Sequence, residues 1–381
     1  MPKYLSYGKQ WITAKDIQAV SDVLESDFLT QGPQVKAFED KLCKYTGAKY
    51  CVAVANGTAA LHIAVAALQI KQGSEGITTP NTFVASANCM LYNGITPRFA
   101  DINPVSYNID PSEILERLSD KTKLLIPVHF AGLPAEIEQI YEIAKEHELH
   151  VIEDAAHAIG SQYADGSYVG NCKYSDMTIF SFHPVKTITT GEGGAVTTNS
   201  KEFYERLLIL RSHGITKDKE KLSINPGPWY YEMRDLGFNY RMTDIQAALG
   251  SSQLERLDKF KKRRREIVAR YTQAFNGIPW LTVPQEPTEV SSCFHLYVPL
   301  IDYERIGKNR REVMEELHSN GIGTQVHYIP VNTLTYYKGI TTDKTPISYS
   351  YYEQCLSIPL YPKMGDSDVE HVIESIINLV K

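Results

Sequence analysis

Apolar segments that alternate with helical patterns restrict the possible folds of this chain more than any other feature. Between residues 50 and 200 we predict strands at 50–56, 97–102, 123–130 and 149–157, separated by helices at 57–70, 110–118 and 135–148. The strands are apolar along nearly their whole length, which is typical of strands buried on both faces. Strands that alternate with helices form a mostly parallel sheet. We therefore predict an α/β fold whose mostly parallel central sheet is covered by helices.

From about residue 200 the pattern changes. Residues 242–275 predict one long helix, and Thr243 and Gln246 fit a capping box at its start. Apolar segments and helices then follow in mixed order, at 294–301, 311–321, 324–331 and 367–380. We therefore predict a large cofactor-binding domain over residues 1–254, which includes an N-terminal arm, and a smaller C-terminal α+β domain over residues 255–381.

The charge and the cysteine pattern argue against several kinds of partner. The formal net charge is −6, which gives no reason to expect binding to nucleic acid or to an anionic membrane. A basic run at 259–268 lies within the predicted long helix, so we expect a solvated helix face there. The six cysteines form no C-x-x-C pair, so we expect neither a disulfide framework nor a metal site. We see no signal sequence and no segment of transmembrane length, and we expect a cytoplasmic protein.

A lysine stands between two strand-like runs in the stretch TIFSFHPVKTITTGEGGAVTTNS, residues 178–200. Lys186 follows the run 178–182 and precedes the run 193–199, so we place it on a turn between two core strands. A lysine in this position either extends to solvent or takes part in chemistry. Its position alone favours the first interpretation, and the neighbouring loops favour the second.

Loops at the carboxyl ends of parallel strands are where open α/β sheets bind ligands. The loop 56–61 follows a strand and begins a helix, so its amides can hold a phosphate or form an ordinary strand–helix turn. Asp154 ends a buried strand, where it can pair with a protonated ring nitrogen or cap a helix. His157 and Phe83 lie near the same edge, and each can instead be an ordinary buried residue.

Together these loops contain the protein groups that a pyridoxal phosphate enzyme requires. The lysine forms a Schiff base with the cofactor's aldehyde, the carboxylate keeps the pyridinium protonated, the aromatic ring stacks on the cofactor and the helix start binds the phosphate. An ordinary lysine, with a pKa of about 10.4, is a poor nucleophile at neutral pH, but burial beside a cationic ring lowers that value. We therefore predict pyridoxal 5′-phosphate as the cofactor.

Three motifs carry a resemblance to a known family: SFHPVK at 181–186 with EGG at 192–194, EDAAHAIG at 153–160 and GFNYRMTDIQAALG at 237–250. From residue 27 to residue 330 the chain resembles the DegT/DnrJ/EryC1/StrS sugar-nucleotide aminotransferases of pyridoxal phosphate fold type I. The resemblance implies a homodimer with shared active sites. It implies Lys186 as the Schiff-base lysine, Asp154 as the pyridinium partner, His157 near the ring hydroxyl, Thr58, Ala59 and Ser181 as phosphate ligands, Phe83 as the stacking residue, and Asn239 as a ligand to the phosphate in the neighbouring subunit.

The resemblance also implies a substrate. The motifs SFHPVKTITTGEGG, LRSHG at 210–214 and QVHYIP at 325–330 are most similar to the subgroup that aminates C4 of a UDP-linked 4-keto-6-deoxy-N-acetylhexosamine in pseudaminic acid synthesis, with glutamate as amino donor. We expect His183, His327 and Tyr328 in the substrate pocket, although each can instead be a satisfied buried polar residue. The alternatives are another nucleotide keto-sugar, of the perosamine or bacillosamine type, or a non-catalytic sugar-nucleotide-binding regulator.

Overall fold

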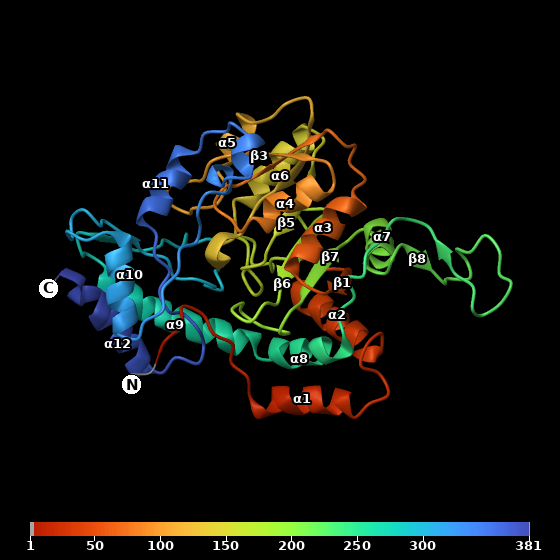
Figure 1. Cartoon of the computed structure of the whole chain (residues 1–381), viewed down its shortest axis with the longest axis horizontal. Coiled ribbons are helices and arrows are strands. Elements are labelled where there is room, and N and C mark those ends of the chain that lie inside the picture. Colours follow the sequence, from red (N-terminus) through yellow and green to blue (C-terminus); the bar gives the residue numbers. More distant parts are fainter. Residues whose placement is uncertain (1–3, 381) are drawn as a thin grey trace.

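A computed structural model describes residues 4–380 of the chain. Its centre is a seven-stranded sheet with the strand order β1-β7-β6-β5-β4-β2-β3 (Figure 1). Strand β7 runs antiparallel to both of its neighbours, and the other adjacent pairs are parallel. The strands are β1 (Tyr50–Val54), β2 (Glu75–Thr78), β3 (Thr96–Phe99), β4 (Thr122–Ile126), β5 (His150–Asp154), β6 (Met177–Ser181) and β7 (Gly194–Thr198). The predicted mostly parallel sheet is confirmed, and β2 is a strand that the apolar pattern did not indicate.

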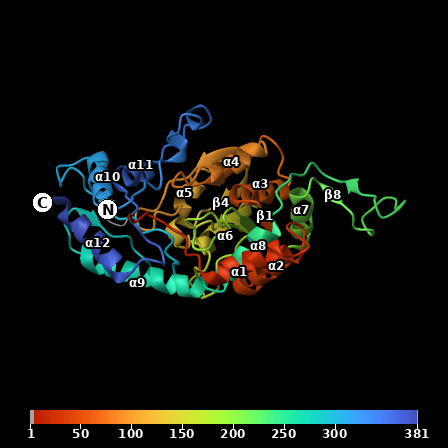
Figure 2. The same ribbon diagram turned by 60° about the horizontal axis from the view of Figure 1, so that its bottom comes forward.

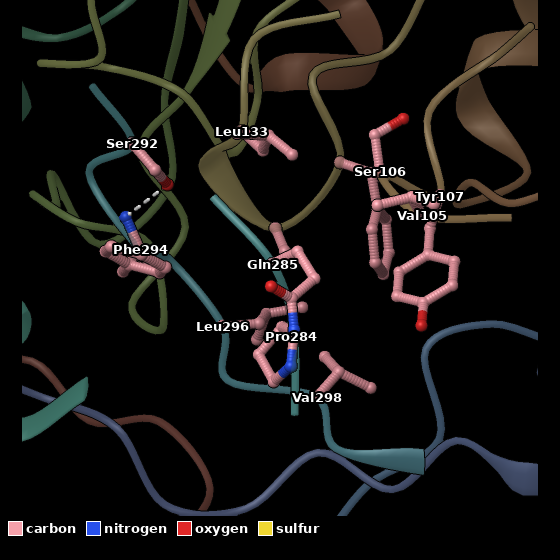
Figure 3. A pocket seen from close by; sticks show the side chains of 12 residues that line it. Val105, Ser106, Tyr107, Leu133, Pro284, Gln285, Ser292, Phe294, Leu296 and Val298 are labelled. Atoms are coloured by element: carbon pink, nitrogen blue, oxygen red, sulfur yellow. Dashed lines mark hydrogen bonds between the residues drawn. The ribbon is translucent and has the colours of Figure 1, made fainter. Parts of the chain in front are cut away.

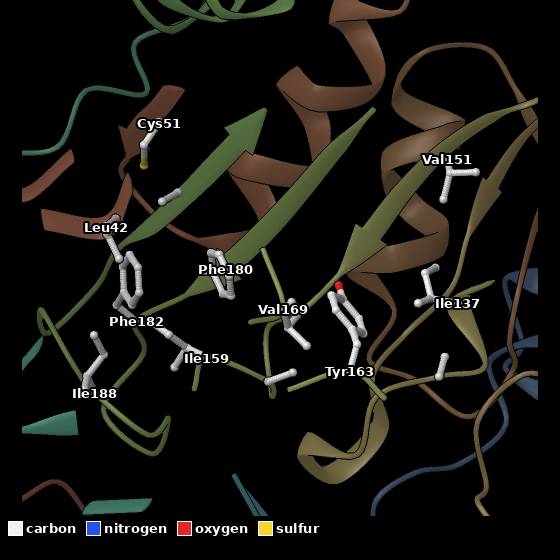
Figure 4. Close-up of a cluster of buried hydrophobic side chains, with 14 of the residues drawn as sticks. Leu42, Cys51, Ile137, Val151, Ile159, Tyr163, Val169, Phe180, Phe182 and Ile188 are labelled. Carbon is white, nitrogen blue, oxygen red and sulfur yellow. The ribbon is translucent and has the colours of Figure 1, made fainter. Parts of the chain in front are cut away.

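Helices cover both faces of this sheet because its strands alternate their buried side chains between the two faces. On one face, strand residues such as Val151 and Phe180 pack against helices α2, α5, α6 and α8 (Figure 4). On the other face, Ile152 and Ile179 pack against α3, α4 and α7. These helices are α2 (Pro33–Thr46), α3 (Gly57–Ala67), α4 (Ala85–Tyr92), α5 (Pro111–Leu115), α6 (Ile137–Glu146), α7 (Lys201–Arg211) and α8 (Asp244–Leu254).

The predicted long helix is two helices, so that expectation was wrong. Helix α8 begins at the predicted capping box, in which Thr243 and Gln246 exchange hydrogen bonds, and it ends at Leu254. Helix α9 (Leu257–Phe275) follows after a break at residues 255–256. Arg256, at the break, binds the carboxylate of Asp16 in helix α1 (Ala14–Leu24) and donates to the carbonyl of Trp11. These are tertiary contacts, and helix propensity, which depends on local sequence, cannot predict them.

The basic run within α9 is not a solvated face throughout. Arg264 is fully buried, and its Nη1 donates to the carbonyls of Phe294, His295 and Leu360 at 2.9–3.3 Å. A buried guanidinium can persist where carbonyl oxygens accept its hydrogen bonds. The run therefore contributes one basic residue to the interior, where it joins α9 to the segments after it.

A separate apolar cluster occupies the C-terminal part of the chain, formed by residues from 267 to 379 together with Leu5. We propose the division at residues 254–255 on this basis, with the N-terminal arm crossing it through backbone bonds between Leu5 and residues 321 and 323. The remaining elements are β10 (Leu281–Thr282), β11 (Leu300–Ile301), α10 (Arg310–Ser319), α11 (Pro346–Gln354) and α12 (Asp366–Ile377). The apolar segments 294–301 and 324–331 are otherwise extended chain joined by isolated bridges.

A hairpin projects from the body of the molecule (Figures 1 and 2). Its two short strands are β8 (Ile215–Thr216) and β9 (Glu232–Met233), which pair antiparallel. Large apolar side chains on and beside it are exposed, including Trp229 at 71% and Leu236 at 74%. Such side chains gather where a protein meets a partner. Within residues 4–380, no helix has both the length and the apolar character needed to cross a membrane.

Candidate active site

Lys186 lies on the turn after β6, where its backbone N–H donates to the carbonyl of His183 at 2.9 Å. The side chain is partly buried. Burial lowers the pKa of Lys186 to about 8, and the nearby Asp154 carboxylate opposes that change. A lysine with this pKa is partly neutral at physiological pH, so it can act as a nucleophile or move a proton.

Asp154 ends β5 with its carboxylate 4% exposed. Ser86 Oγ donates to Oδ2 at 2.6 Å, and the amide of Ala156 donates to Oδ1 at 3.0 Å. A carboxylate accepts about four hydrogen bonds in favourable geometry, so these two leave capacity for a further donor. The contact with Ala156 shows that Asp154 also caps the turn after β5, so the two interpretations of this residue are compatible.

His157 and Tyr328 meet, although they are 171 positions apart, and His157 is close enough to Lys186 to be affected by its charge. The Tyr328 hydroxyl lies 3.2 Å from His157 Nε2. Nδ1 of His157 is buried and has no hydrogen-bond partner among residues 4–380. Burial, followed by the charges of Lys186 and His327, keeps the pKa of His157 well below its ordinary value. The ring is therefore neutral and has a ring nitrogen available.

His327 joins the same group, whereas His183 does not pack into it. His327 is 7% exposed, and its Nδ1 lies 2.7 Å from Ser357 Oγ. Burial and the charge of Lys186 lower the pKa of His327 to about 3. The side chain of His183 is exposed, and its bond to Lys186 is made by its carbonyl.

The start of α3 and the end of β6 form a small concave surface. A Cβ added to Gly57 would lie 2.9 Å from Ser181 Cβ and 3.1 Å from Ser181 Oγ, so only glycine fits there. Thr58 is exposed, and the first amides of a helix have no partner within it. The amide of Ala59 already donates to Asn56 Oδ1, at 2.8 Å. The amides of Gly57 and Thr58 and the hydroxyls of Thr58 and Ser181 thus remain available to an anion.

Phe83 lies at the same edge of the sheet and is 58% exposed, so the interpretation as a core residue is wrong. Its carbonyl accepts a hydrogen bond from Ser86 Oγ at 3.3 Å, and this serine also binds Asp154. Asn239 is exposed as well. Its backbone forms an isolated bridge with Ser212, and among residues 4–380 no hydrogen bond joins it to Lys186.

A small apolar cavity of about 30 Å³ lies between residues 105–107, 130–133 and 284–298 (Figure 3). Tyr107, Phe130, Leu296 and Val298 are among its lining residues. Neither Lys186 nor Asp154 lines it, and its walls offer little chemistry. The candidate site is therefore the group around Lys186 and not this cavity.

Comparison with known proteins assigns the family. The chain matches the DegT/DnrJ/EryC1/StrS aminotransferase family over residues 10–377. The chain belongs to this family. The aminotransferase is 41% identical to the spore coat polysaccharide biosynthesis protein SpsC of Bacillus subtilis, with 99% of this chain and 97% of SpsC covered. It is also 41% identical to an uncharacterized protein of Methanocaldococcus jannaschii, with 97% and 96% covered.

Solved structures of sugar aminotransferases share the aminotransferase's fold. PseC of Helicobacter pylori, an aminotransferase of pseudoaminic acid biosynthesis, superimposes with a TM-score of 0.93 at 31% identity over 99% of both chains. Spr1654 of Streptococcus pneumoniae, solved in PLP and PMP forms, superimposes in its PMP form with a TM-score of 0.90 at 32% identity over 98% of both chains. The expected pyridoxal phosphate fold type I and the resemblance noted from the motifs are confirmed.

The residues of the aminotransferase fit pyridoxal phosphate. The surface at Gly57 and Ser181 suits a phosphate, because it offers helix-start amides and hydroxyls without a side chain in the way. Asp154 has capacity to accept a hydrogen bond from a ring N–H, and the exposed Phe83 is joined to it through Ser86. The buried, unpaired Nδ1 of His157 can meet a polar group of the ring. The charge of Lys186 acts on His157, and that of Asp154 acts on Lys186, so the three groups lie near one another.

Two residues of the aminotransferase's site were not predicted from the sequence. Ser86, which binds Asp154, stands three positions after Phe83, in a segment whose sequence points only to its aromatic residue. His295 is 3% exposed, and its ring lies 4.4 Å from that of His157. Burial, followed by the charges of His157 and Lys186, holds the pKa of His295 well below its ordinary value. No sequence signal pointed to His295, because it stands in an apolar segment far from the other motifs.

Proposed function

We propose that this aminotransferase transfers an amino group from glutamate to C4 of a UDP-linked 4-keto-6-deoxy-N-acetylhexosamine, as in pseudaminic acid synthesis. The cofactor is pyridoxal 5′-phosphate, as predicted from the sequence. The observation that carries the substrate assignment is the likeness to PseC over 99% of both chains. The motifs SFHPVK and QVHYIP support it independently.

Each residue of the site has a task in this reaction. Pyridoxal phosphate, when bound, supplies an electron sink and carries the amino group between the two half-reactions. Lys186, with a pKa of about 8, anchors the cofactor and then moves a proton at the reacting carbon. Asp154 holds the proton on the ring nitrogen, and His157 and Tyr328 orient the ring and exclude water from its edge.

The nucleotide of the substrate supplies binding energy remote from the reacting carbon, which positions the keto group. His327 and Tyr328 are our candidates for contacts with the sugar. The charge of Lys186 acts on His327, and Tyr328 packs against His327 and contacts His157. Neutral His327 can exchange hydrogen bonds without placing a second positive charge near the lysine. His183 is a third candidate, because its exposed side chain lies on the same turn as Lys186.

A second candidate is amination of another nucleotide keto-sugar, of the perosamine or bacillosamine type. The identity to SpsC, 41%, exceeds the 31% identity to PseC, which favours a sugar of a different polysaccharide. A non-catalytic sugar-nucleotide-binding regulator is disfavoured, because such a protein has no use for a partly neutral lysine. We expect the enzyme to work in the cytoplasm, where its six free cysteines stay reduced.

The test of the substrate is a half-reaction. The enzyme is converted to its pyridoxamine phosphate form with glutamate and is then offered a panel of keto-sugar nucleotides, while the absorption of the cofactor is followed. The two C5 epimers of the UDP-4-keto sugar, prepared separately, are included. They differ in the direction of one methyl group, so we expect a preference of roughly ten- to two-hundred-fold for the L-arabino epimer. Equal or reversed preference would reject the pseudaminic acid assignment.

We further propose a homodimer in which Asn239 serves the partner's cofactor. The supporting observations are that Asn239 is exposed, that it does not reach Lys186 of its own chain, and that the neighbouring hairpin exposes Trp229 and Leu236. Inactive Lys186→Ala mixed with Asn239→Ala should regain activity, because one site of the mixed dimer has both intact residues. No recovery, with subunit exchange verified, would count against a shared site.

A further inference from the structure

Glu153, the residue before Asp154, is a fully buried carboxylate to which the reaction assigns no task. Adjacent residues of a strand point to opposite faces of a sheet. Ile152 belongs to the apolar cluster on the α3 face, whereas Val151 belongs to the cluster on the α6 face. Asp154 therefore faces Ser86 and α4, and Glu153 lies on the opposite face, where it binds Tyr163. Figure 4 shows Tyr163 in the apolar cluster on that face.

Four donors saturate this carboxylate. On Oε2 they are His129 Nε2 at 2.9 Å and the Tyr163 hydroxyl at 2.5 Å. On Oε1 they are Ser175 Oγ at 2.5 Å and Thr178 Oγ1 at 2.9 Å. Burial by itself would raise the pKa of Glu153, but these hydrogen bonds, led by that of His129, hold the pKa below its ordinary value. The group is an ionised carboxylate with no acceptor capacity left for a ligand.

His129 connects this network to the active site. Its Nδ1 accepts from the amide of Ala135 at 3.0 Å, so the proton is on Nε2, which donates to Glu153. The backbone N–H of His129 donates to the carbonyl of Asp154 at 3.1 Å, and the N–H of Asp154 donates to the carbonyl of Pro127 at 2.9 Å. Residue 128 thus pairs in parallel with Asp154. His129 is thus bound to both consecutive carboxylate residues of β5, to Glu153 through its imidazole and to Asp154 through its backbone N–H.

The loop that His129 begins also supports His157. The carbonyl of His129 accepts from the amide of Gly132 at 3.2 Å, and the Gly132 carbonyl accepts from Ser161 Oγ at 2.6 Å. A Cβ on Gly132 would lie 3.0 Å from both the carbonyl of His157 and the amide of His295. The loop therefore packs against the backbone of both buried histidines, without space for adjustment.

We propose that Glu153 and His129 are positioning residues, which fix the loop after β4 so that the Asp154 carboxylate and the His157 ring are held against the cofactor. This inference rests on the aminotransferase function proposed above. A purely structural role would make Glu153 a satisfied buried carboxylate like any other, with no effect on the cofactor beyond general stability.

Variants can separate the two roles. Glu153→Gln replaces one acceptor oxygen by a donor that faces existing donors, so the network must rearrange. His129→Asn retains an acceptor near Nδ1 but loses the bond to Glu153, whereas His129→Gln retains a donor near Nε2. Asp16→Asn is the matched control: Asp16 is 1% exposed and also accepts from several donors, Thr13, Ser252 and Arg256, but it lies in α1.

The decisive readout is the pH at which the absorption of the bound cofactor changes, measured together with kcat for glutamate and the Tm of the apoenzyme. A displaced Asp154 no longer stabilises the proton on the ring nitrogen. Loss of that positive charge favours protonation of the lysine nitrogen joined to the cofactor. We expect Glu153→Gln and His129→Asn to raise the midpoint pH of this absorption change by about half a pH unit or more. We also expect both variants to lower kcat about tenfold.

The controls give the remaining expectations. Asp16→Asn should lower the Tm without moving the midpoint, and His129→Gln should recover at least part of the loss seen in His129→Asn. If Glu153→Gln does not fold, the two His129 variants decide. The inference is overturned if Glu153→Gln and His129→Asn both behave as Asp16→Asn does. Failure of the wild type to take up the amino group of glutamate would instead refute the function.

Discussion

Lys186 should react as a neutral amine at a much lower pH than an ordinary lysine. Burial lowers its pKa to about 8, and the charge of Asp154 opposes this change. At pH 7 such a pKa leaves roughly one amine in eleven neutral, whereas the ordinary value of about 10.4 leaves roughly one in 2,500. We therefore expect Lys186 of the apoenzyme to react with a small amine-specific reagent on the order of 200-fold faster than an amine with the ordinary pKa.

Competitive labelling of the apoenzyme across a pH series, read by mass spectrometry of each lysine peptide, measures this titration. Lys201, whose side chain is 75% exposed, serves as an internal reference. Labelling of Lys186 should rise with a midpoint near pH 8. In Asp154→Asn the midpoint should move to still lower pH, because the charge that raises the lysine's pKa is gone. A wild-type midpoint near 10, or an upward shift in Asp154→Asn, would refute the electrostatic reasoning.

Three further predictions concern the same site. Asp154→Asn should retain much of the cofactor binding, because the phosphate site is intact, but should lose most turnover in a glutamate half-reaction; near-normal turnover would leave Asp154 as a cap alone. Gly57→Ala should weaken cofactor binding about tenfold by displacing Ser181, as measured by titration of the apoenzyme, whereas Gly339→Ala, with open space around it, should not. Because the pKa of Lys186 is lower in the folded apoenzyme, the unfolded chain binds more protons between pH 8 and about 10.4, so this residue makes stability increase with pH across that window. Lys186→Met should flatten the pH dependence of the unfolding free energy there.

The sequence was sufficient for features that depend on neighbouring residues. Apolar runs indicated the strands of the sheet, and the capping box at Thr243 and Gln246 formed as predicted. Strand β2 was missed because Glu75 and Gly76 interrupt its apolar pattern. The motifs indicated the cofactor and the family, and two of them, EDAAHAIG and SFHPVK, stand at the ends of strands β5 and β6 of one sheet.

Tertiary packing decided which distant residues meet at the site and where the long helical segment breaks. His157 and Tyr328 are 171 positions apart, and His295 joins them from an apolar segment, so their meeting depends on how the C-terminal part packs on the sheet. The break after α8 depends on contacts of Arg256 with the N-terminal arm. Periodicity encodes which face of an element is buried, because it repeats with the element's own geometry. It carries no information on which distant side chains pack together. The low pKa of Lys186 depends on such packing, because burial among distant segments is what lowers it.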